Sequence, residues 1–363
     1  MKHALRRAGR IALYGALGGS MVLGSAVAAT AASAAPAPNA SASVDTALRI
    51  TGLAGPNKLA ISQVPGQNIF LVTDVAPISA GPGCAVVAVP DGQFGVQCRA
   101  LLGSGTNFKT FLVNAGGGDD IVTNNAPAPM RADGGAGNDV LNGGALGDIL
   151  RDSSGNDTLR GNGGQDDLNT DFESGGGIHD VLDGGAELDI LYAGPGDDTL
   201  LGGSGNDRLV GGKGADMMDA GDGTGDVVAY ENRTSRHVIS LDGVDNDGEA
   251  PGLTGPPTER DNVLPSVEIV QGSAGPDTMI GNDNPNTFEG FDGNDSLEGG
   301  KGADQLRGGR GNDNLASNRF FGVPVADGAI DTLDGFDGSD YCRVPFVNVE
   351  ADITISCENI NQD

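Results

Sequence analysis

Aspartate and glycine recur together in this chain at a spacing of nine residues, a pattern suited to holding cations. Residues 202–219 read GGSGNDRLV GGKGADMMD, two consecutive copies of one template: Gly, Gly, any, Gly, any, Asp, any, large apolar, any. The glycines permit tight turns that expose backbone carbonyl oxygens around one carboxylate. Calcium accepts several oxygen ligands in flexible geometry, whereas magnesium requires a tight octahedron and retains its water. The template therefore predicts calcium binding through oxygen ligands.

The same frame extends far beyond these two copies. Residues 134–142, 299–307 and 308–316 match every template position, and degenerate copies fill much of the remaining sequence from 115 to 343. The apolar eighth residue suits a very short strand with one inward side chain. Repetition at a fixed period predicts a solenoid. The template carboxylates are Asp120, Asp139, Asp148, Asp157, Asp166, Asp180, Asp189, Asp198, Asp207, Asp216, Asp277, Asp295, Asp304, Asp313, Asp331 and Asp340.

We expect these aspartates to be metal ligands, with turn carbonyls of the template glycines completing each site. The glycines in question are Gly135, Gly137, Gly155, Gly196, Gly203, Gly205, Gly212, Gly214, Gly293, Gly300, Gly302, Gly309 and Gly311. A single Asp-Gly turn is more often a solvated loop. The periodic array makes that interpretation improbable for the set.

These nonapeptides, which cover about half of the chain, resemble the repeats-in-toxin (RTX, hemolysin-type) calcium-binding motif of secreted proteins, of the actinobacterial kind. The resemblance implies an all-β fold, a right-handed parallel β-roll solenoid in two blocks. It implies that each motif makes half a turn and that the eighth residue fills the core. Calcium would lie between the glycine turns of motifs n and n+2.

The resemblance also implies which aspartates share an ion. The pairs are Asp139–Asp157, Asp148–Asp166, Asp180–Asp198, Asp189–Asp207, Asp198–Asp216, Asp277–Asp295, Asp295–Asp313 and Asp313–Asp331. Asn286 and Gly322 occupy the carboxylate position. We therefore expect sites that depend on them, including those of Asp304, to be weak or empty.

Composition and charge narrow the classes of partner. The 363 residues include 62 glycines and no tryptophan, and the formal net charge is −29. Nucleic acid is a poor partner for so acidic a chain, because the two would repel each other. Zinc is improbable, because beyond the N-terminal segment the only histidines are His179 and His237 and the four cysteines look paired.

Residues 1–34 are predicted to form a secretory signal peptide. A basic start precedes an apolar run from Ile11 to Ala29 and a small-residue end at Ala32-Ser33-Ala34, and we expect cleavage after Ala34. An uncleaved membrane anchor is the alternative. Arg6-Arg7 leaves the export route open between the general and the twin-arginine pathway. Residues 35–46 are an Ala/Pro/Ser linker, and no membrane span is expected after cleavage.

Residues 47–114 are predicted to form a small β lead-in domain that caps the solenoid, because short β-type runs alternate there with Gly and Pro. Four cysteines allow three pairings, and an exported protein favours disulfides. We favour Cys84–Cys98 and Cys342–Cys357, because each closes a short loop around an expected hairpin.

The remaining boundaries follow the repeat frame. Residues 115–228 form the first repeat block, 229–271 an irregular insert with strand-like segments at HVISL and VEIVQG, 272–343 the second block, and 344–363 a C-terminal cap. Within the insert, Asp245–Gly248 resembles the start of an EF-hand loop but lacks its glutamate at the twelfth position.

Each nonapeptide buries one aliphatic side chain, which is too little to offset the ordering of nine glycine-rich residues. The bare repeats should therefore fold only when calcium removes carboxylate repulsion and links neighbouring turns. The chain has neither His-Glu-x-x-His nor Gly-x-Ser-x-Gly. We expect a secreted, non-catalytic calcium-binding protein with a role in cell-surface or matrix interaction. The alternative is a secreted polysaccharide-active enzyme that uses the β-roll flank.

Overall fold

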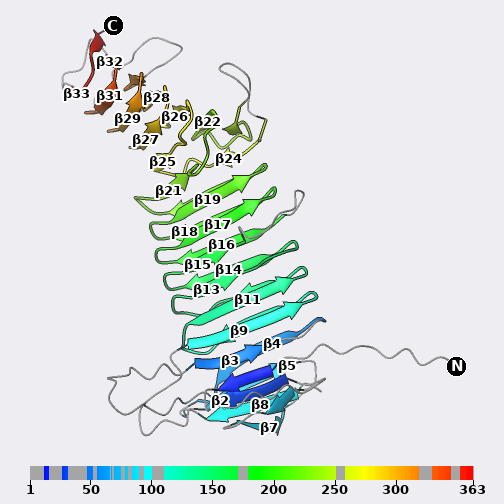
Figure 1. The fold of residues 1–363 in the computed structure, drawn as a ribbon. Coiled ribbons are helices and arrows are strands. Elements are labelled where there is room, and N and C mark those ends of the chain that lie inside the picture. Colours follow the sequence, from blue (N-terminus) through cyan, green and yellow to red (C-terminus); the bar gives the residue numbers. More distant parts are fainter. Residues whose placement is uncertain are drawn as a thin grey trace, which may run out of the picture. The chain divides into compact units, whose positions relative to one another are not determined.

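The computed structural model describes the larger part of the chain. The described residues are 12–15, 27–31, 47–51, 55–65, 67, 69–74, 78–80, 84–89, 94–99, 110–170, 179–250, 258–318, 329–344 and 352–362. They form strands and turns, and none of them is helical (Figure 1). No described segment is a helix long and apolar enough to cross a membrane. The all-β prediction is confirmed.

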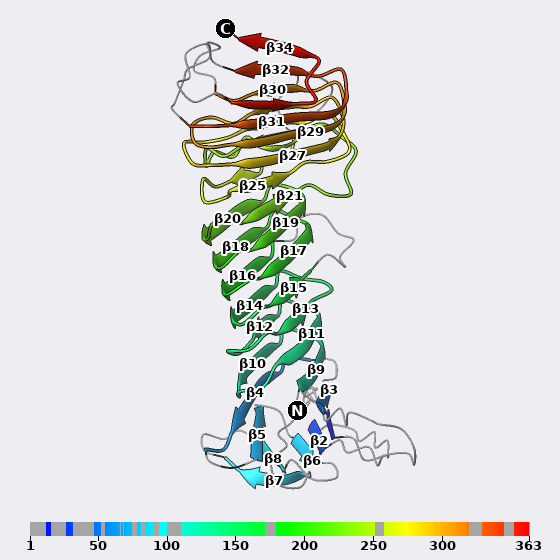
Figure 2. The ribbon, with the colours of Figure 1, turned by 90° about the vertical axis from the view of Figure 1, so that its left-hand side faces the viewer.

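The fold divides into two compact units. Unit 1 comprises Met1–Glu173 with His179–Asp189, and unit 2 comprises Ser174–Ile178 with Ile190–Asp363. Each unit contains parallel strands stacked coil upon coil, so the predicted parallel β-solenoid is confirmed (Figure 2).

Unit 1 begins with short strands that lead into the solenoid. An antiparallel sheet in the order β4-β5-β8-β7 joins β4 (Lys58–Gln63), β5 (Ile69–Asp74), β8 (Phe94–Arg99) and β7 (Cys84–Ala88). β4 also pairs in parallel with the first strand of one solenoid sheet, and β3 (Ala47–Thr51) with the first strand of the other. The rings of Phe70 and Phe111 pack edge to face 5.3 Å apart beneath this junction. The lead-in strands thus supply partners for the first coil.

The Cys84–Cys98 disulfide and the cleavage of the signal peptide after Ala34 stay predictions. The backbones of Cys84 and Cys98 lie directly opposite each other in the β7–β8 pair, a register compatible with the expected disulfide. Short strands β1 (Ala12–Gly15) and β2 (Val27–Ala31) pair with β3 in its sheet, and β6 (Ile78–Ala80) pairs with β1 and β2. The linker 35–46 and the expected cleavage site lie outside the described residues.

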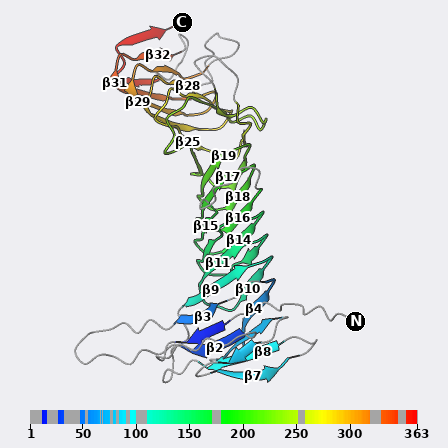
Figure 3. The same cartoon turned by 45° about the vertical axis from the view of Figure 1, so that its right-hand side comes forward.

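The solenoid of unit 1 consists of two parallel sheets (Figure 3). One contains β9 (Thr110–Gly117), β11 (Met130–Ala136), β13 (Ile149–Arg151) and β15 (Asp167–Asn169), and the other β10 (Ile121–Asn125), β12 (Val140–Asn142), β14 (Thr158–Gly163) and β16 (Val181–Ala186).

The register brings equivalent template positions together. Leu141 pairs with Leu159 and Leu150 with Leu168, and all four side chains are fully buried. Leu159 in turn pairs with Leu182, so the five-residue insertion after residue 169 leaves the apolar column in register. The prediction that the eighth template residue fills the core is confirmed.

Unit 2 contains three sheets. The first runs β17 (Ile190–Pro195), β19 (Arg208–Lys213), β21 (Val227–Ala229), β25 (Ile269–Gln271), β27 (Thr287–Asp292), β29 (Gln305–Gly311), β31 (Thr332–Gly338) and β33 (Ile353–Ile355). The second contains β18 (Thr199–Ser204), β20 (Met217–Asp222) and β24 (Asn262–Val263). The third runs β23 (Gly248–Glu249), β22 (His237–Ser240), β26 (Thr278–Ile280), β28 (Ser296–Glu298), β30 (Asn314–Ala316), β32 (Tyr341–Val344) and β34 (Asn359–Gln362).

The insert 229–271 joins this framework. Its predicted strand segments are confirmed as β22 and β25, and both pair in register with solenoid strands. Val228 stacks directly on Val270, so the intervening residues are an excursion from an otherwise continuous sheet. The insert therefore continues the coil although its sequence leaves the nine-residue frame.

The C-terminal end is closed by the predicted disulfide. Cys342 and Cys357 are bonded, with their Cα atoms 6.0 Å apart. Cys342 is fully buried and continues the apolar column beside Leu315. Its strand β32 pairs with β34, the last strand of the chain.

Candidate metal sites

Template aspartates stack into columns, one carboxylate per coil. In unit 1, the backbone NH of Asp120 donates to Oδ1 of Asp139 at 2.7 Å, and the NH of Asp139 donates to Oδ1 of Asp157 at 2.7 Å. Asp157 repeats this contact with Asp180 at 2.8 Å. A second column uses the same contact at 2.6 Å between Asp148 and Asp166 and at 2.8 Å between Asp166 and Asp189. The predicted pairs Asp139–Asp157 and Asp148–Asp166 are therefore neighbours in a column.

Unit 2 has four further columns of the same design. Their members are Asp198, Asp216 and Asp261; Asp207, Asp226 and Glu268; Asp277, Asp295, Asp313, Asp340 and Glu358; and Asn286, Asp304, Asp331 and Asp352. The predicted pairs Asp198–Asp216, Asp277–Asp295 and Asp295–Asp313 are neighbours here. The pairs Asp180–Asp198 and Asp189–Asp207 would join the two units and stay predictions.

One predicted pair is wrong. The NH of Asp313 donates to Asp340 at 2.9 Å, and Asp331 instead receives the NH of Asp304 at 2.8 Å. The frame slips because strand β29 pairs with β31 at Leu306 and Leu333, which keeps the apolar column matched across a longer excursion. Gly322, expected to interrupt the column, lies outside the described residues.

The column carboxylates are buried, and many have one oxygen with no protein donor. Every template aspartate is at most 3% exposed. One carboxylate oxygen accepts the backbone NH, and the other finds no hydrogen-bond partner in the aspartates Asp120, Asp139, Asp166, Asp216, Asp295, Asp313 and Asp340. A buried ionised oxygen without a partner is costly. Carboxylate oxygens of this kind are the ligands that a hard divalent cation requires.

A family model matches many of the repeats that carry these columns. The model describes four copies of the RTX calcium-binding nonapeptide repeat. It matches residues 131–145, 143–172, 174–209, 192–227 and 289–320. The nonapeptides within these segments are RTX calcium-binding repeats. No curated protein matches the chain.

RTX repeats bind calcium, and the residues here fit that ion. The column aspartates supply unpartnered carboxylate oxygens, and the turns supply carbonyls that face the neighbouring coil. All the predicted ligand glycines except Gly196 have φ between +99° and +156°. A Cβ added to Gly155 would overlap the carbonyl oxygen of Gly137, and one at Gly311 would overlap that of Gly293. Which glycine carbonyls bind the ion stays a prediction.

The first glycine of the RTX template has its own structural reason. A Cβ at Gly134 would lie 2.6 Å from Oδ2 of Asp139, and one at Gly202 would lie 2.7 Å from Oδ2 of Asp207. One carboxylate oxygen of the template aspartate therefore occupies the space in which any larger residue would place its side chain. Positions two and four provide positive φ, and position one provides room for the carboxylate.

In the absence of metal, burial disfavours the ionised form of these carboxylates. Desolvation raises the pKa of Asp120 to about 7, of Asp166 to about 8 and of Asp295 to about 7. Desolvation is the largest cause; neighbouring carboxylates also contribute to the raised pKa, and the backbone NH donors lower it. A divalent cation would reverse the balance, because it favours the ionised form.

The densest cluster in unit 1 includes an aspartate outside the predicted set. Asp152 stands where the repeat 152–160 would have its first glycine, and its carboxylate lies within 4.8 Å of ligand oxygens of Asp139 and Asp157. All three residues are buried. Desolvation and these two neighbours raise the pKa of Asp152 to about 9. These three carboxylates lie close enough together to hold one metal ion.

Sequence analysis missed several column members. They are Asp226, Asp261, Glu268, Asp352 and Glu358. Asp226 could have been found, because it follows Asp216 within a repeat lengthened by one residue. Glu358 lies two nine-residue steps after Asp340, but it carries glutamate in place of the template aspartate. Asp261, Glu268 and Asp352 lie beyond longer excursions, and no uninterrupted series of nine-residue repeats leads to them.

Asn286 occupies its column as predicted. Its backbone NH donates to Asp304 at 2.8 Å, and its side-chain Nδ2 is buried without a hydrogen-bond partner. An amide brings no charge and presents a donor nitrogen that cannot bind a cation. The weakness expected of the site beside Asn286 stays a prediction.

Proposed function

We propose that this protein is a secreted, non-catalytic calcium-binding β-roll protein whose repeats fold when calcium binds. The observation that carries the proposal is the stack of buried carboxylates with oxygens that no protein group satisfies. Calcium bridging successive coils supplies the missing partner, so its binding free energy becomes folding free energy. RTX repeats are typical of secreted proteins, and extracellular calcium is abundant enough to drive this transition.

The proposed ligands are the template aspartates and turn glycines named from the sequence, joined by Asp152 and Asp226. Far-ultraviolet circular dichroism of the full chain, first in chelator and then during calcium titration, tests the proposal. We expect β-signal to increase with calcium, and to increase far less with magnesium at the same concentration. An unchanged spectrum across the titration would reject calcium-dependent folding.

Secretion has its own test. When the full chain is expressed in a host with a general export pathway, we expect the protein in the medium to begin at Ala35, as determined by intact mass. A protein retained in the membrane fraction at full mass would favour the anchor alternative.

We further propose that the folded roll acts in cell-surface or matrix interaction. The column carboxylates are buried, so contacts with a partner would fall to other residues on the surface of the roll. Calcium-dependent retention of the protein on isolated cell envelopes, lost in chelator and restored by calcium, is the expected result. Equal retention in both conditions would reject a role for the folded roll.

A second candidate function is supported by a groove in unit 2. The groove encloses about 370 Å³ and is lined by Glu289, Phe291, Asp292, Arg307, Gly308, Gly309, Arg310, Phe336 and Asp337. Phe291 and Phe336 flank Gly309 on adjacent strands, have positive φ, and are 46% and 50% exposed. Exposed aromatic rings beside paired Arg and Asp groups suit a polysaccharide chain.

Two assays distinguish polysaccharide binding in this groove from polysaccharide cleavage. If the protein only binds polysaccharide, it should be retained on immobilised uronate polymers in the presence of calcium, and no new reducing ends should form. The formation of unsaturated or reducing ends, abolished by Arg310→Gln, would instead establish the enzyme.

A further inference from the structure

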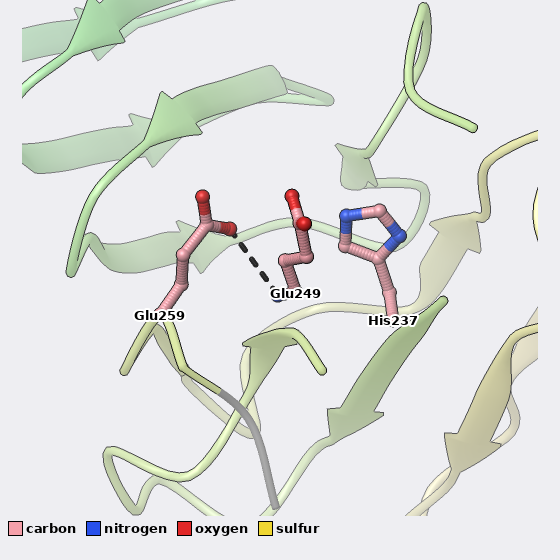
Figure 4. A group of neighbouring side chains, drawn as sticks. All are labelled: His237, Glu249 and Glu259. Carbon is pink, nitrogen blue, oxygen red and sulfur yellow. Dashed lines mark hydrogen bonds between the residues drawn. The ribbon is translucent and has the colours of Figure 1, made fainter. Parts of the chain in front are cut away.

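A cluster of three side chains in the insert adjoins one calcium column, because the backbone NH of His237 donates to Oδ1 of Asp277 at 2.9 Å. His237, Glu249 and Glu259 each place a ligand atom within 4.8 Å of the others. They come from strand β22, strand β23 and the segment after it (Figure 4). His237 and Glu249 are directly opposed in the antiparallel β22–β23 pair, so their side chains share one face of the sheet.

His237 is the unusual member of the cluster. The residue is completely buried, and neither ring nitrogen has a hydrogen-bond partner. Its Nδ1 lies 3.4 Å from Oδ1 of Asp277 without forming a hydrogen bond, and the ring packs 5.0 Å from that of Tyr230. Figure 4 shows the other ring nitrogen turned toward the carboxylate of Glu249. A buried imidazole with both nitrogens unsatisfied is costly unless a ligand completes it.

The two glutamates are held toward this nitrogen. Glu259 accepts the backbone NH of Glu249 at 3.2 Å and the guanidinium of Arg233 at 2.6 Å. Arg233 also lies 3.9 Å from Glu249. One arginine neutralises only one of the two carboxylates, so the cluster retains a negative charge. The side chain of Glu249 is 41% exposed, which leaves a route from solvent.

We propose that His237, Glu249 and Glu259 bind one zinc-class transition-metal ion. An imidazole nitrogen and two carboxylates form a donor set that suits zinc and its neighbours, whereas calcium takes oxygen ligands only. Asp277 holds His237 in place through the backbone of that residue, because Oδ1 of Asp277 accepts the NH of His237 at 2.9 Å. The fourth position opens to solvent beside Glu249. The expectation that zinc is improbable rested on counting histidines and cysteines, and it did not consider glutamates as partners.

This inference does not depend on the proposed function, and its test is performed on the folded, calcium-saturated full chain. Cobalt(II) serves as the spectroscopic probe, because nitrogen ligation in a four-coordinate site gives a visible absorption band that oxygen-ligated calcium sites do not give. Calorimetric titration with zinc in excess calcium gives stoichiometry and affinity. We expect one zinc per chain and the visible cobalt band.

Variants identify the ligands. Glu249→Gln should weaken zinc at least about tenfold, since even the loss of a residue supporting a metal ligand has that effect. Glu231→Gln is the matched control, because Glu231 is a 37% exposed glutamate of the insert that is likewise paired with an arginine. His237→Asn should abolish the cobalt band, and His179→Ala should leave it intact.

Circular dichroism of each variant in calcium shows whether it is folded. If His237→Asn fails to fold, Glu249→Gln still decides the matter through its affinity. Absence of zinc binding to the folded wild-type protein would overturn the proposal. So would a Glu249→Gln affinity equal to that of wild type, because zinc would then be bound elsewhere.

Discussion

Replacing Asp295 by asparagine should change stability in opposite directions with and without calcium. Oδ1 of Asp295 accepts the NH of Asp277 at 2.8 Å, and an amide oxygen preserves that contact. Its Oδ2 has no hydrogen-bond partner, and the residue is 2% exposed. The substitution therefore removes a buried charge and leaves an amide nitrogen in the position of Oδ2, so the stabilisation derived from the charge is an upper limit.

The magnitude follows from the raised pKa of Asp295. Burial raises this pKa from 3.8 to about 7, and one pKa unit corresponds to about 1.4 kcal/mol. A carboxylate whose pKa is higher in the folded state than in the unfolded state destabilises the fold when it ionises. The destabilisation is absent below about pH 4 and complete above about pH 7. In chelator at pH 8, Asp295→Asn should stabilise the fold by up to about 4 kcal/mol.

In calcium the sign reverses, because the variant loses a ligand. If calcium at a hundred times its dissociation constant no longer fills one site, about 2.7 kcal/mol of stabilisation disappears. Urea unfolding in saturating calcium measures this loss. The gain in chelator is measured as the concentration of sucrose or trimethylamine oxide needed to fold the chain.

Asp292→Asn is the matched control, because Asp292 belongs to the same repeat but its side chain is 58% exposed. This control should change stability by less than about 0.5 kcal/mol in either condition. Asp295→Asn shifting stability in the same direction with and without calcium would refute the column as a calcium site. An equal effect of the control would refute the assignment to Asp295.

Three further predictions use other parts of the fold. Gly155→Ala should destabilise the calcium-loaded protein by more than about 1 kcal/mol, because φ is +142° and the new Cβ would overlap the carbonyl of Gly137. Gly163→Ala, whose Cβ would have 3.7 Å of clearance, should cost less than half as much in thermal melts. In chelator, the β-signal of the chain should rise as the pH is lowered from 8 to 4, because protonation removes the cost of burying ionised carboxylates whose pKa values are raised. In calcium, the same titration should lower the β-signal, because protonated carboxylates no longer bind the ion. Cys357→Ser should cost about 3 kcal/mol in urea unfolding, the value for a loop of 15 residues closed by Cys342, and a wild-type protein equally stable with and without reductant would contradict this.

The regular part of the fold was predictable because one short template specifies it completely. Leu141 and Leu159 pair, and Asp139 and Asp157 stack, because both pairs are one coil apart in a sequence that repeats every half coil. Glycine at fixed positions provides the φ values that no other residue adopts cheaply. At these template positions the local backbone preference and the long-range packing favour the same structure, so the periodicity of the sequence is enough to predict the fold there.

The frame fails where the chain leaves the coil and returns. After Asp313 the sequence continues in nine-residue steps, so Asp331 is the expected partner, yet the structure selects Asp340. The apolar column determines this result, because Leu315 must meet a buried residue and Cys342 provides it. Loop length adds little entropy cost, so packing in the column outweighs sequence distance. Counting residues cannot reveal that choice.

The insert shows what a coil needs once the template is absent. Its sequence lacks the glycine pattern, yet Asp261 accepts the NH of Asp216 at 3.0 Å and Glu268 accepts that of Asp226 at 3.0 Å. The returning strands β24 and β25 place Val263 and Val270 in the apolar column, and both are fully buried. An acid one position before the strand and an apolar residue within it are thus retained when everything else varies. The carboxylate and the inward side chain are the requirements for stacking, and the glycines are an additional requirement of the turns that hold calcium.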